Sequence, residues 1–322
     1  MKRYLLGTVF AVATPMAAAA QDCGEVSIAE MNWASAQIVT AVTEFLLVQG
    51  YSCDVTVVPS DTTPAVTSLS ENNEPDIVPE LWPNSAGDAY KKLKADGKIV
   101  ELTSVLDPGG VEGWWIPTYL AEEHPELKTI EGILENPELV GGMFNNCPDG
   151  WGCRVVSDNL ARAYDLEGNG IEVFNHGSGE TMVTSMASAY ESQEPWFGYY
   201  WAPTTPLGKY DMTSVDLGEY DEAAHSANQN ADTPEPKASA FPTAPVLTVM
   251  TKDFHDANPE IAEFIGNVTF KTNSMSQLLA WQGENNASNE EAAVYFLQNN
   301  KDVWADWLSE DARGNLSKLL EQ

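Results

Sequence analysis

The most constraining feature of this sequence is a strand–helix–strand pattern that begins near residue 24. Residues 24–31 form a short apolar strand, residues 35–49 carry apolar side chains at helical spacing, and residues 54–59 form a second strand. Gly50 stands where a helix-ending glycine is expected. A crossover helix makes the two strands parallel, and such crossovers are right-handed. Residues 24–59 are therefore predicted to form a βαβ unit of a parallel α/β sheet.

The rest of the chain predicts a second lobe of the same class. A turn at residues 107–110 marks the exit from the first lobe, and strands near 139–144, 171–174 and 196–201, with a helix over 179–189, form the second. Residues 213–243 are polar and without periodicity, and a strand over 243–251 is the expected return crossing. The predicted division is residues 21–117 plus 246–322 for the first lobe and 118–245 for the second.

The N-terminal residues have the pattern of a secretory leader. Lys2 and Arg3 precede an apolar stretch, and three alanines end it, so residues 1–20 are predicted to be a signal peptide cleaved after Ala20. A membrane anchor is the alternative, but the apolar run is too short, and no later run approaches the roughly 20 residues of a spanning helix. We expect export to the periplasm without membrane insertion.

The charge balance excludes two classes of partner. The chain has 48 acidic and 16 basic residues, a formal net charge of −32. Nucleic acids and anionic membrane surfaces both require a basic footprint. We therefore expect no nucleic-acid partner and no binding to anionic membrane surfaces.

Four cysteines are predicted to pair in an oxidising compartment. The simplest of the three possible pairings joins Cys147 to Cys153 and Cys23 to Cys53. A zinc site is the alternative, although the spacing is not that of paired CxxC motifs and no histidine neighbours either pair.

Signatures of catalysis are absent from the sequence. The four histidines are scattered, and HExxH, GxSxG, P-loop and GxGxxG patterns are missing. We predict neither an enzyme nor a cofactor or metal site.

Tryptophans are the informative residues. Trp33, Trp82 and Trp151 each follow a predicted strand, and Trp201 closes one. Ligands of α/β lobes bind at these carboxyl ends of the strands. Indole faces attract cations, above all quaternary ammonium groups. For any one tryptophan a core position is an equal alternative, but four at strand ends predict an aromatic cage between the lobes. Trp115 is the reserve member of this cage.

Five stretches resemble a known family. The chain is similar to the substrate-binding proteins of ABC importers for quaternary amines, which take up glycine betaine, proline betaine, choline or trimethylamine N-oxide. The matching stretches are residues 31–33 (MNW), 79–85 (PELWPNS), 147–153 (CPDGWGC), 199–203 (YYWAP) and 304–307 (WADW). The resemblance covers essentially the whole mature chain.

The resemblance implies a type II-like, two-lobe periplasmic binding protein. Each lobe would be a mostly parallel sheet flanked by helices, with the ligand in the cleft between the lobes. Trp82, Trp151 and Trp201 would line the aromatic box, and the backbone N–H groups of Gly152 and Cys153 would hold a ligand carboxylate. The partners implied are a small methylated amine and an inner-membrane ABC permease, and we expect a monomer.

Trp33 resembles a fourth wall found in part of the family, which favours the trimethylamine N-oxide branch. In that branch an acidic residue at a helix start meets the oxide, and Glu131 fits; the alternative is that acidic residues commonly occupy first helical turns. A betaine carboxylate needs a buried partner, and Arg154 is the only cationic side chain near the cage motifs. The expected order is trimethylamine N-oxide, then glycine betaine, then choline.

Two other classes of function remain as alternatives. An enzyme that acts on methylated amines would need a metal or cofactor site. A binding protein for polyamines or cationic amino acids would present acidic side chains in place of tryptophans.

Overall fold

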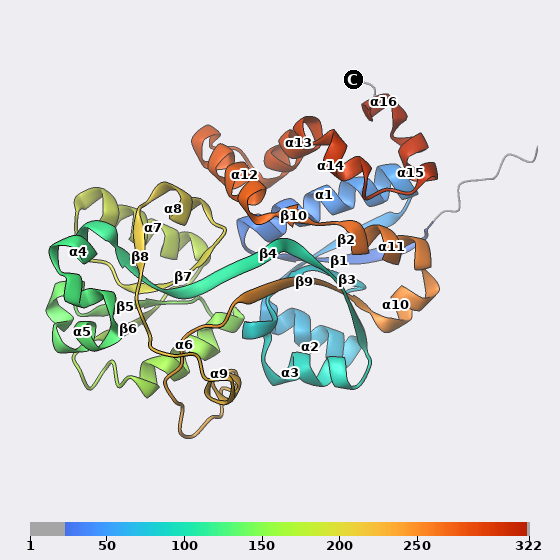
Figure 1. The fold of residues 1–322 in the computed structure, drawn as a ribbon. Coiled ribbons are helices and arrows are strands. Elements are labelled where there is room, and N and C mark those ends of the chain that lie inside the picture. The colour runs from blue at the N-terminus through green and yellow to red at the C-terminus, as the bar shows by residue number, and fades with distance from the viewer. Residues whose placement is uncertain (1–22, 321–322) are drawn as a thin grey trace, which may run out of the picture.

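The protein consists of two α/β lobes that lie side by side. A computed structural model describes residues 23–320. Two strands, β4 (Ile99–Pro117) and β9 (Ala244–Thr251), run between the lobes (Figure 1). Within the described part of the chain, no helix is both long and apolar enough to cross a bilayer. The predicted signal peptide lies outside the described residues. The two-lobe α/β fold predicted from the sequence is confirmed.

The first lobe begins with the predicted βαβ unit. Strand β1 (Glu25–Met31) pairs in parallel with β2 (Asp54–Ser60) and with β3 (Ile77–Leu81). Strand β9 is antiparallel to both β3 and β4, and the short β10 (Phe270–Lys271) is parallel to β4. Five strands of this lobe therefore run one way, and β9 runs against them.

Helices cover both faces of this sheet (Figure 1). On one side are α2 (Thr62–Asn72) and α3 (Pro83–Ala95), and on the other is α1 (Ala34–Tyr51) with much of the C-terminal chain. The C-terminal helices are α10 (Lys252–Ala257), α11 (Pro259–Asn267), α12 (Thr272–Asn285), α13 (Asn289–Asn299), α14 (Lys301–Ala305), α15 (Glu310–Asn315) and α16 (Ser317–Leu320).

The end of α1 differs from the prediction. Gly50 lies inside the helix, and the residue that ends it is Ser52, in the left-handed conformation with φ 56°. A Cβ at position 50 would lie 3.4 Å from the Leu316 side chain and 3.5 Å from that of Ala312. The helix continues past Gly50 because this face packs against the C-terminal helices, a tertiary contact that local sequence does not reveal.

The second lobe has the same plan. Strand β5 (Met143–Asn146) is parallel to β6 (Glu172–Asn175) and β7 (Gly198–Ala202), while β4 is antiparallel to β7 and to β8 (Met212–Ser214). Its helices are α4 (Thr118–Glu123), α5 (Ile130–Glu135), α6 (Gly152–Ala163), α7 (Gly179–Ser192), α8 (Thr205–Lys209) and α9 (Glu222–Asn228). Short 3₁₀ helices span Pro125–Lys128 and Pro137–Val140. Each lobe is thus mostly parallel, with one strand reversed.

Strand β4 serves both lobes. Its first part pairs with β9 as far as Gly110, and its second part pairs with β7 from Val111 onward. We propose that the lobes divide within β4 and β9, close to the predicted boundaries at residues 117 and 246.

Two predicted segments need correction. The strand expected at 139–144 begins only at Met143, because Gly141 and Gly142, with φ of 79° and 64°, first turn the chain out of a 3₁₀ helix. The segment 213–243 holds the end of β8 and the helix α9, whose N-cap Asp221 accepts a hydrogen bond from the Ala224 N–H.

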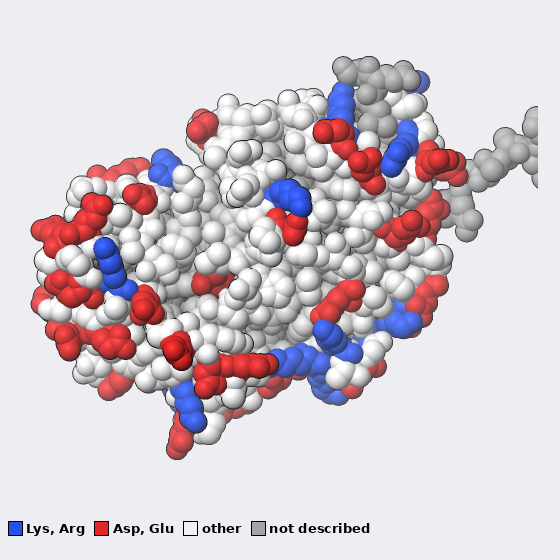
Figure 2. Space-filling model, in the orientation of Figure 1, with Lys and Arg blue, Asp and Glu red and all other residues white. Residues whose placement is uncertain are grey.

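Acidic side chains dominate the face shown in Figure 2, most densely over the second lobe at the left. Exposed glutamates there lie on α4, α5 and the adjoining 3₁₀ helices. On this face of the second lobe the surface is mainly negative, which disfavours contact with a polyanion there.

Candidate ligand-binding site

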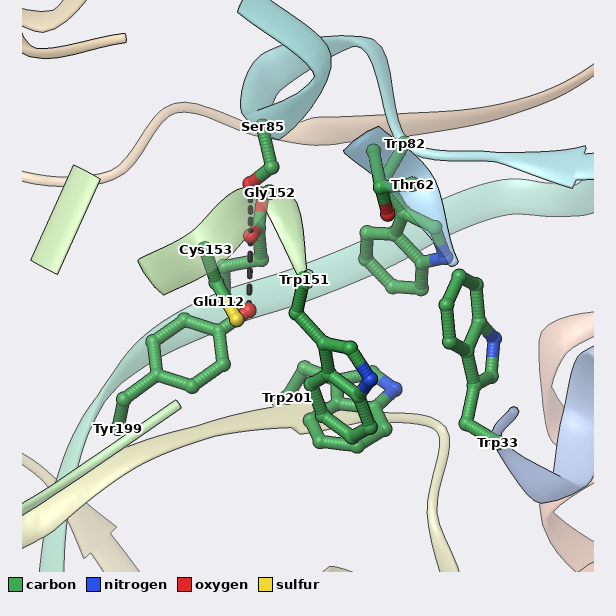
Figure 3. Close-up of a pocket in the computed structure, with 10 residues that line it drawn as sticks. All are labelled: Trp33, Thr62, Trp82, Ser85, Glu112, Trp151, Gly152, Cys153, Tyr199 and Trp201. Atoms are coloured by element: carbon green, nitrogen blue, oxygen red, sulfur yellow. Dashed lines mark hydrogen bonds between the residues drawn. The ribbon is translucent and has the colours of Figure 1, made fainter. Parts of the chain in front are cut away.

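One cavity lies between the lobes, and it is enclosed by the four predicted tryptophans (Figure 3). Its volume is about 30 Å³. The rest of its wall comes from both lobes and consists of Thr62, Ser85, Glu112, Gly152, Cys153 and Tyr199. The structure therefore brings together six of the predicted site residues, namely Trp33, Trp82, Trp151, Trp201, Gly152 and Cys153.

Three of the indoles stand immediately before a helix. Trp33 is the N-cap residue of α1, Trp82 that of α3 and Trp151 that of α6, each with an extended backbone. Trp201 lies near the end of β7. In parallel sheets the loops between strand and following helix meet at the carboxyl ends of the strands. This topology brings residues that are distant in sequence to one cleft.

Trp151 occupies the centre of the cage. Its ring centroid is 5.7 Å from that of Trp33 and 5.0 Å from that of Trp201, and both pairs are edge-to-face. Its Nε1 donates to the Oδ1 of Asn32 at 2.6 Å, a bond from the second lobe to the first. The indole of the second lobe is therefore held in contact with the first lobe.

The loop that carries Trp151 is closed by a disulfide. Cys147 is bonded to Cys153, and Cys23 is bonded to Cys53, as predicted. The Gly150 carbonyl in this loop accepts a hydrogen bond from the Thr63 N–H at 3.1 Å. The loop is thus fixed at both ends and contacts the first lobe.

Gly152 and Cys153 begin α6, so their N–H groups precede the first intrahelical hydrogen bonds. A Cβ on residue 152 would lie 2.1 Å from the Ser85 carbonyl oxygen. Only glycine at this position allows α6 to approach the first lobe so closely.

Glu112, which sequence reasoning missed, is the carboxyl group in the cavity wall. It is buried on β4, and its Oε1 accepts hydrogen bonds from the Ser85 hydroxyl at 2.7 Å and the Tyr199 hydroxyl at 2.8 Å. Its Oε2 has no hydrogen-bond partner among the described residues. Burial raises the pKa of Glu112 above its ordinary value, although both hydroxyl donors act in the opposite direction. The only feature of the sequence that could have pointed to Glu112 is that it is the single charged residue in the run 108–117.

Glu80 is the second missed residue. It lies on β3 behind the cage, with no exposed surface, and its Oε1 accepts from the Nε1 atoms of Trp33 and Trp82. Residues 79–81, directly before Trp82, belong to β3.

The structure does not bring Glu131 to the cage, so the predicted contact of this residue with the ligand is corrected. Glu131 is exposed in the first turn of α5, at the outer end of the second lobe (Figure 1). Helix α5 precedes β5, whereas the cavity is lined by the first residues of α6, which follows β5.

The reserve residue Trp115 is not in the cavity wall either. Its Nε1 donates to the Tyr200 carbonyl at 3.1 Å. Side chains alternate along a strand, so Trp115 lies on the opposite face of β4 from Glu112.

The lobes also meet away from the cage. The carbonyl of Asn84, in α3, accepts hydrogen bonds from His225 Nε2 at 3.2 Å and from Gln229 Nε2. Lys91 Nζ donates to the Ser226 hydroxyl at 2.5 Å. We call these five residues the α3–α9 contact. It joins the first lobe to segment 213–243, which is polar and without periodicity in the sequence.

Comparison with known proteins gives a consistent result. A family model for the substrate binding domain of the ABC-type glycine betaine transport system matches residues 24–299. The glycine betaine/proline betaine-binding periplasmic protein of Salmonella typhimurium is 24% identical over 195 residues, 56% of this chain and 57% of that protein. The match thus spans little more than half the length of that relative.

Two solved structures share the fold. A glycine betaine, L-proline-binding protein of Borrelia burgdorferi has a TM-score of 0.74 and 17% identity, covering 90% of this chain and 99% of its own. An ABC-transporter choline binding protein in complex with choline has a TM-score of 0.74 and 19% identity, covering 92% of this chain and 98% of its own.

Proposed function

This chain belongs to the family of substrate-binding domains of ABC-type glycine betaine transport systems, and we propose that it captures a small trimethylammonium-type osmolyte and delivers it to a membrane permease. The observation that carries this proposal is the convergence of four indoles, two from each lobe, on one cavity. Each indole face attracts a cation by about 0.5–2 kcal/mol. A methylated ammonium group fits such walls because its methyl groups are apolar and its charge is diffuse.

The proposed location is the periplasm, after removal of the leader. The two disulfides support this, since such bonds persist in oxidising compartments. Recognition needs both lobes, because the indoles of the second lobe complete a cage that the first lobe only half encloses. Ligand binding would therefore favour the closed arrangement, which a permease can distinguish from the open one.

Within this class we propose trimethylamine N-oxide as the preferred ligand. The cavity is small, and this ligand is the most compact of the three. Glu112 supports it chemically. Burial raises the pKa of Glu112, which favours its protonated form, and a proton on Oε2 would be donated to the oxide oxygen. Glycine betaine ranks second, because its carboxylate would need the N–H groups of Gly152 and Cys153 as well. Choline ranks third, because its hydroxyl would need Glu112 as an acceptor.

Calorimetric titrations test which chemical class of ligand the protein binds. The purified mature protein should bind trimethylamine N-oxide, glycine betaine or choline, in that expected order, and should bind a primary ammonium ligand of similar size far more weakly. Alanine substitution should cost about 1–3 kcal/mol of binding free energy at each of Trp82, Trp151 and Trp201, and phenylalanine should cost less. Tighter binding of the primary amine than of the methylated ligands would refute the cage. A purely binding role would be refuted if NMR showed that the bound ligand is chemically converted.

The pH dependence distinguishes the ligands. If neutral Glu112 donates to the oxide, affinity for trimethylamine N-oxide falls as pH rises through the raised pKa of this group. Choline affinity would rise over the same range, because an ionised Glu112 accepts its hydroxyl proton. Glu112→Gln keeps a donor, and should retain oxide binding while flattening the pH profile. Tighter binding of glycine betaine than of trimethylamine N-oxide would overturn the ranking and leave the broader proposal standing.

A further inference from the structure

A single carboxyl oxygen holds two walls of the cage. The Oε1 of Glu80 accepts from Trp33 Nε1 at 2.7 Å, from Trp82 Nε1 at 3.0 Å and from the Ser35 hydroxyl at 3.0 Å. Glu80 itself does not line the cavity. Both indoles come from the first lobe, one before α1 and the other before α3.

The second lobe anchors its walls differently. Trp151 donates to Asn32 across the lobe interface, so that bond forms only when the lobes meet. The bonds to Glu80, by contrast, lie wholly within the first lobe and do not depend on closure. The two indoles of the first lobe can therefore be fixed while the protein is open.

We propose that Glu80 is a positioning residue that fixes Trp33 and Trp82 as a preformed half-cage, by accepting both indole N–H groups at one oxygen. This inference rests on the proposed function, since it assigns the half-cage the task of first contact with a methylated ammonium group. A ligand that meets two fixed indoles does not have to order them on binding, and less affinity is lost to side-chain ordering.

Glu80 acts in this arrangement as a hydrogen-bond acceptor rather than as a counter-charge. Its side chain is completely buried, and its Oε2 has no partner among the described residues. Burial raises the pKa of this carboxyl group more than the three donors lower it, which favours the neutral acid. In the neutral acid the proton would lie on Oε2, because Oε1 already accepts three hydrogen bonds. Glutamine reproduces this acceptor and the shape of the side chain, whereas leucine does not.

Two variants test the acceptor role. Glu80→Leu leaves two buried indole N–H groups without a partner and should weaken binding of trimethylamine N-oxide by about tenfold or more. Glu80→Gln should bind within about twofold of the wild type, a difference of about 0.4 kcal/mol. A matched control is Ser185→Ala, which removes the acceptor of the Trp196 N–H, 3.0 Å away and outside the cavity. This control should leave affinity unchanged.

A double-mutant cycle separates positioning from general destabilisation. The Trp33→Phe/Trp82→Phe variant keeps two aromatic faces but has no N–H for Glu80 to accept. In this background Glu80→Leu should change affinity by less than about twofold. An equal loss in both backgrounds would overturn the inference, and so would a Glu80→Gln variant as weak as Glu80→Leu.

Near-ultraviolet circular dichroism of the ligand-free protein gives a second readout. Glu80→Leu should reduce the indole bands, and the reduction should vanish in the Trp33→Phe/Trp82→Phe background. Because this measurement needs no ligand, it tests Glu80 even if the titrations refute the proposed ligand class. Unchanged bands in Glu80→Leu would show that the indoles are fixed without Glu80 and would overturn the inference.

Discussion

The close contact between the Trp82 ring and Gly110 of β4 provides the sharpest test of the cage geometry. A Cβ added at Gly110 would lie 2.3 Å from Cη2 and 2.5 Å from Cζ3 of the indole, and 2.9 Å from the Ala202 carbonyl oxygen. Carbon atoms in contact lie about 3.5–4.0 Å apart. Gly110→Ala must therefore displace the Trp82 ring by about 1.2 Å (3.5 − 2.3), with the backbone of β7 blocking the Cβ on another side.

The ring has little freedom to absorb this displacement. Trp82 is 6% exposed, and its Nε1 lies 3.0 Å from Glu80 Oε1, a bond that such a shift would lengthen or break. Overpacking of this kind costs about 1–3 kcal/mol. If most of that cost falls on the geometry of the cage, affinity for the ligand should fall by about 5- to 140-fold.

Calorimetric titration of Gly110→Ala measures the loss of ligand affinity. A thermal melt of the same variant shows how much of the overpacking free energy lowers the stability of the fold. Gly113→Ala is the matched control on the same strand, since its Cβ would lie 3.5 Å from both the Ser214 hydroxyl and Trp115 Nε1, an ordinary contact. This control should bind like the wild type. If Gly110→Ala folds and binds as tightly as Gly113→Ala, the Trp82 ring does not lie against β4 in the functional state, and the reasoning is refuted.

Two further predictions concern the disulfides and the α3–α9 contact. Removing the Cys147–Cys153 bond should weaken ligand binding more than it lowers the melting temperature, because the bond closes the six-residue interval that presents Trp151. Removing Cys23–Cys53, which spans 30 residues, should do the reverse. Equal effects of the two changes on affinity would contradict this. Burial lowers the pKa of His225, and its Nδ1 has no partner in the described part of the chain, so the closed form disfavours protonation. The stability of the closed form, and with it ligand affinity, should therefore fall as pH drops below about 6.5, the ordinary histidine pKa. His225→Gln, titrated between about pH 5 and 7.5, should flatten this decline, and an unchanged slope would exclude His225 as its cause.

The positions of the tryptophans could be predicted because their placement depends on local order along the chain. In a parallel α/β lobe, each strand is followed by a loop at the same edge of the sheet. Trp33, Trp82 and Trp151 each stand directly before a helix, and Trp201 stands in a strand next to a proline turn. Reading strands and helices in order was therefore enough to place four indoles at one cleft.

The roles of the carboxyl groups could not be predicted in this way. Glu131 satisfied the local rule for a helix start, yet it is exposed and distant from the cage. Glu112 is only a lone charge in the run 108–117, and Glu80 lies in a stretch that resembles the family, but nothing local in either segment indicates that the carboxyl group is buried or which donors it accepts from. Glu112 is identified by contacts with Ser85, 27 residues away, and Tyr199, 87 residues away.

The two α/β lobes and the indoles at the cleft could be predicted from the sequence, because periodicity and loop position are properties of neighbouring residues. For the cysteines the sequence indicated the simplest of three pairings, and the structure contains that pairing. Which carboxyl groups are buried could not be predicted from local sequence, since burial and hydrogen-bond partners come from segments far apart in the chain. The desolvation that raises the pKa of Glu112 and Glu80 exists only once β3, β4, β7 and the helices around them have packed together.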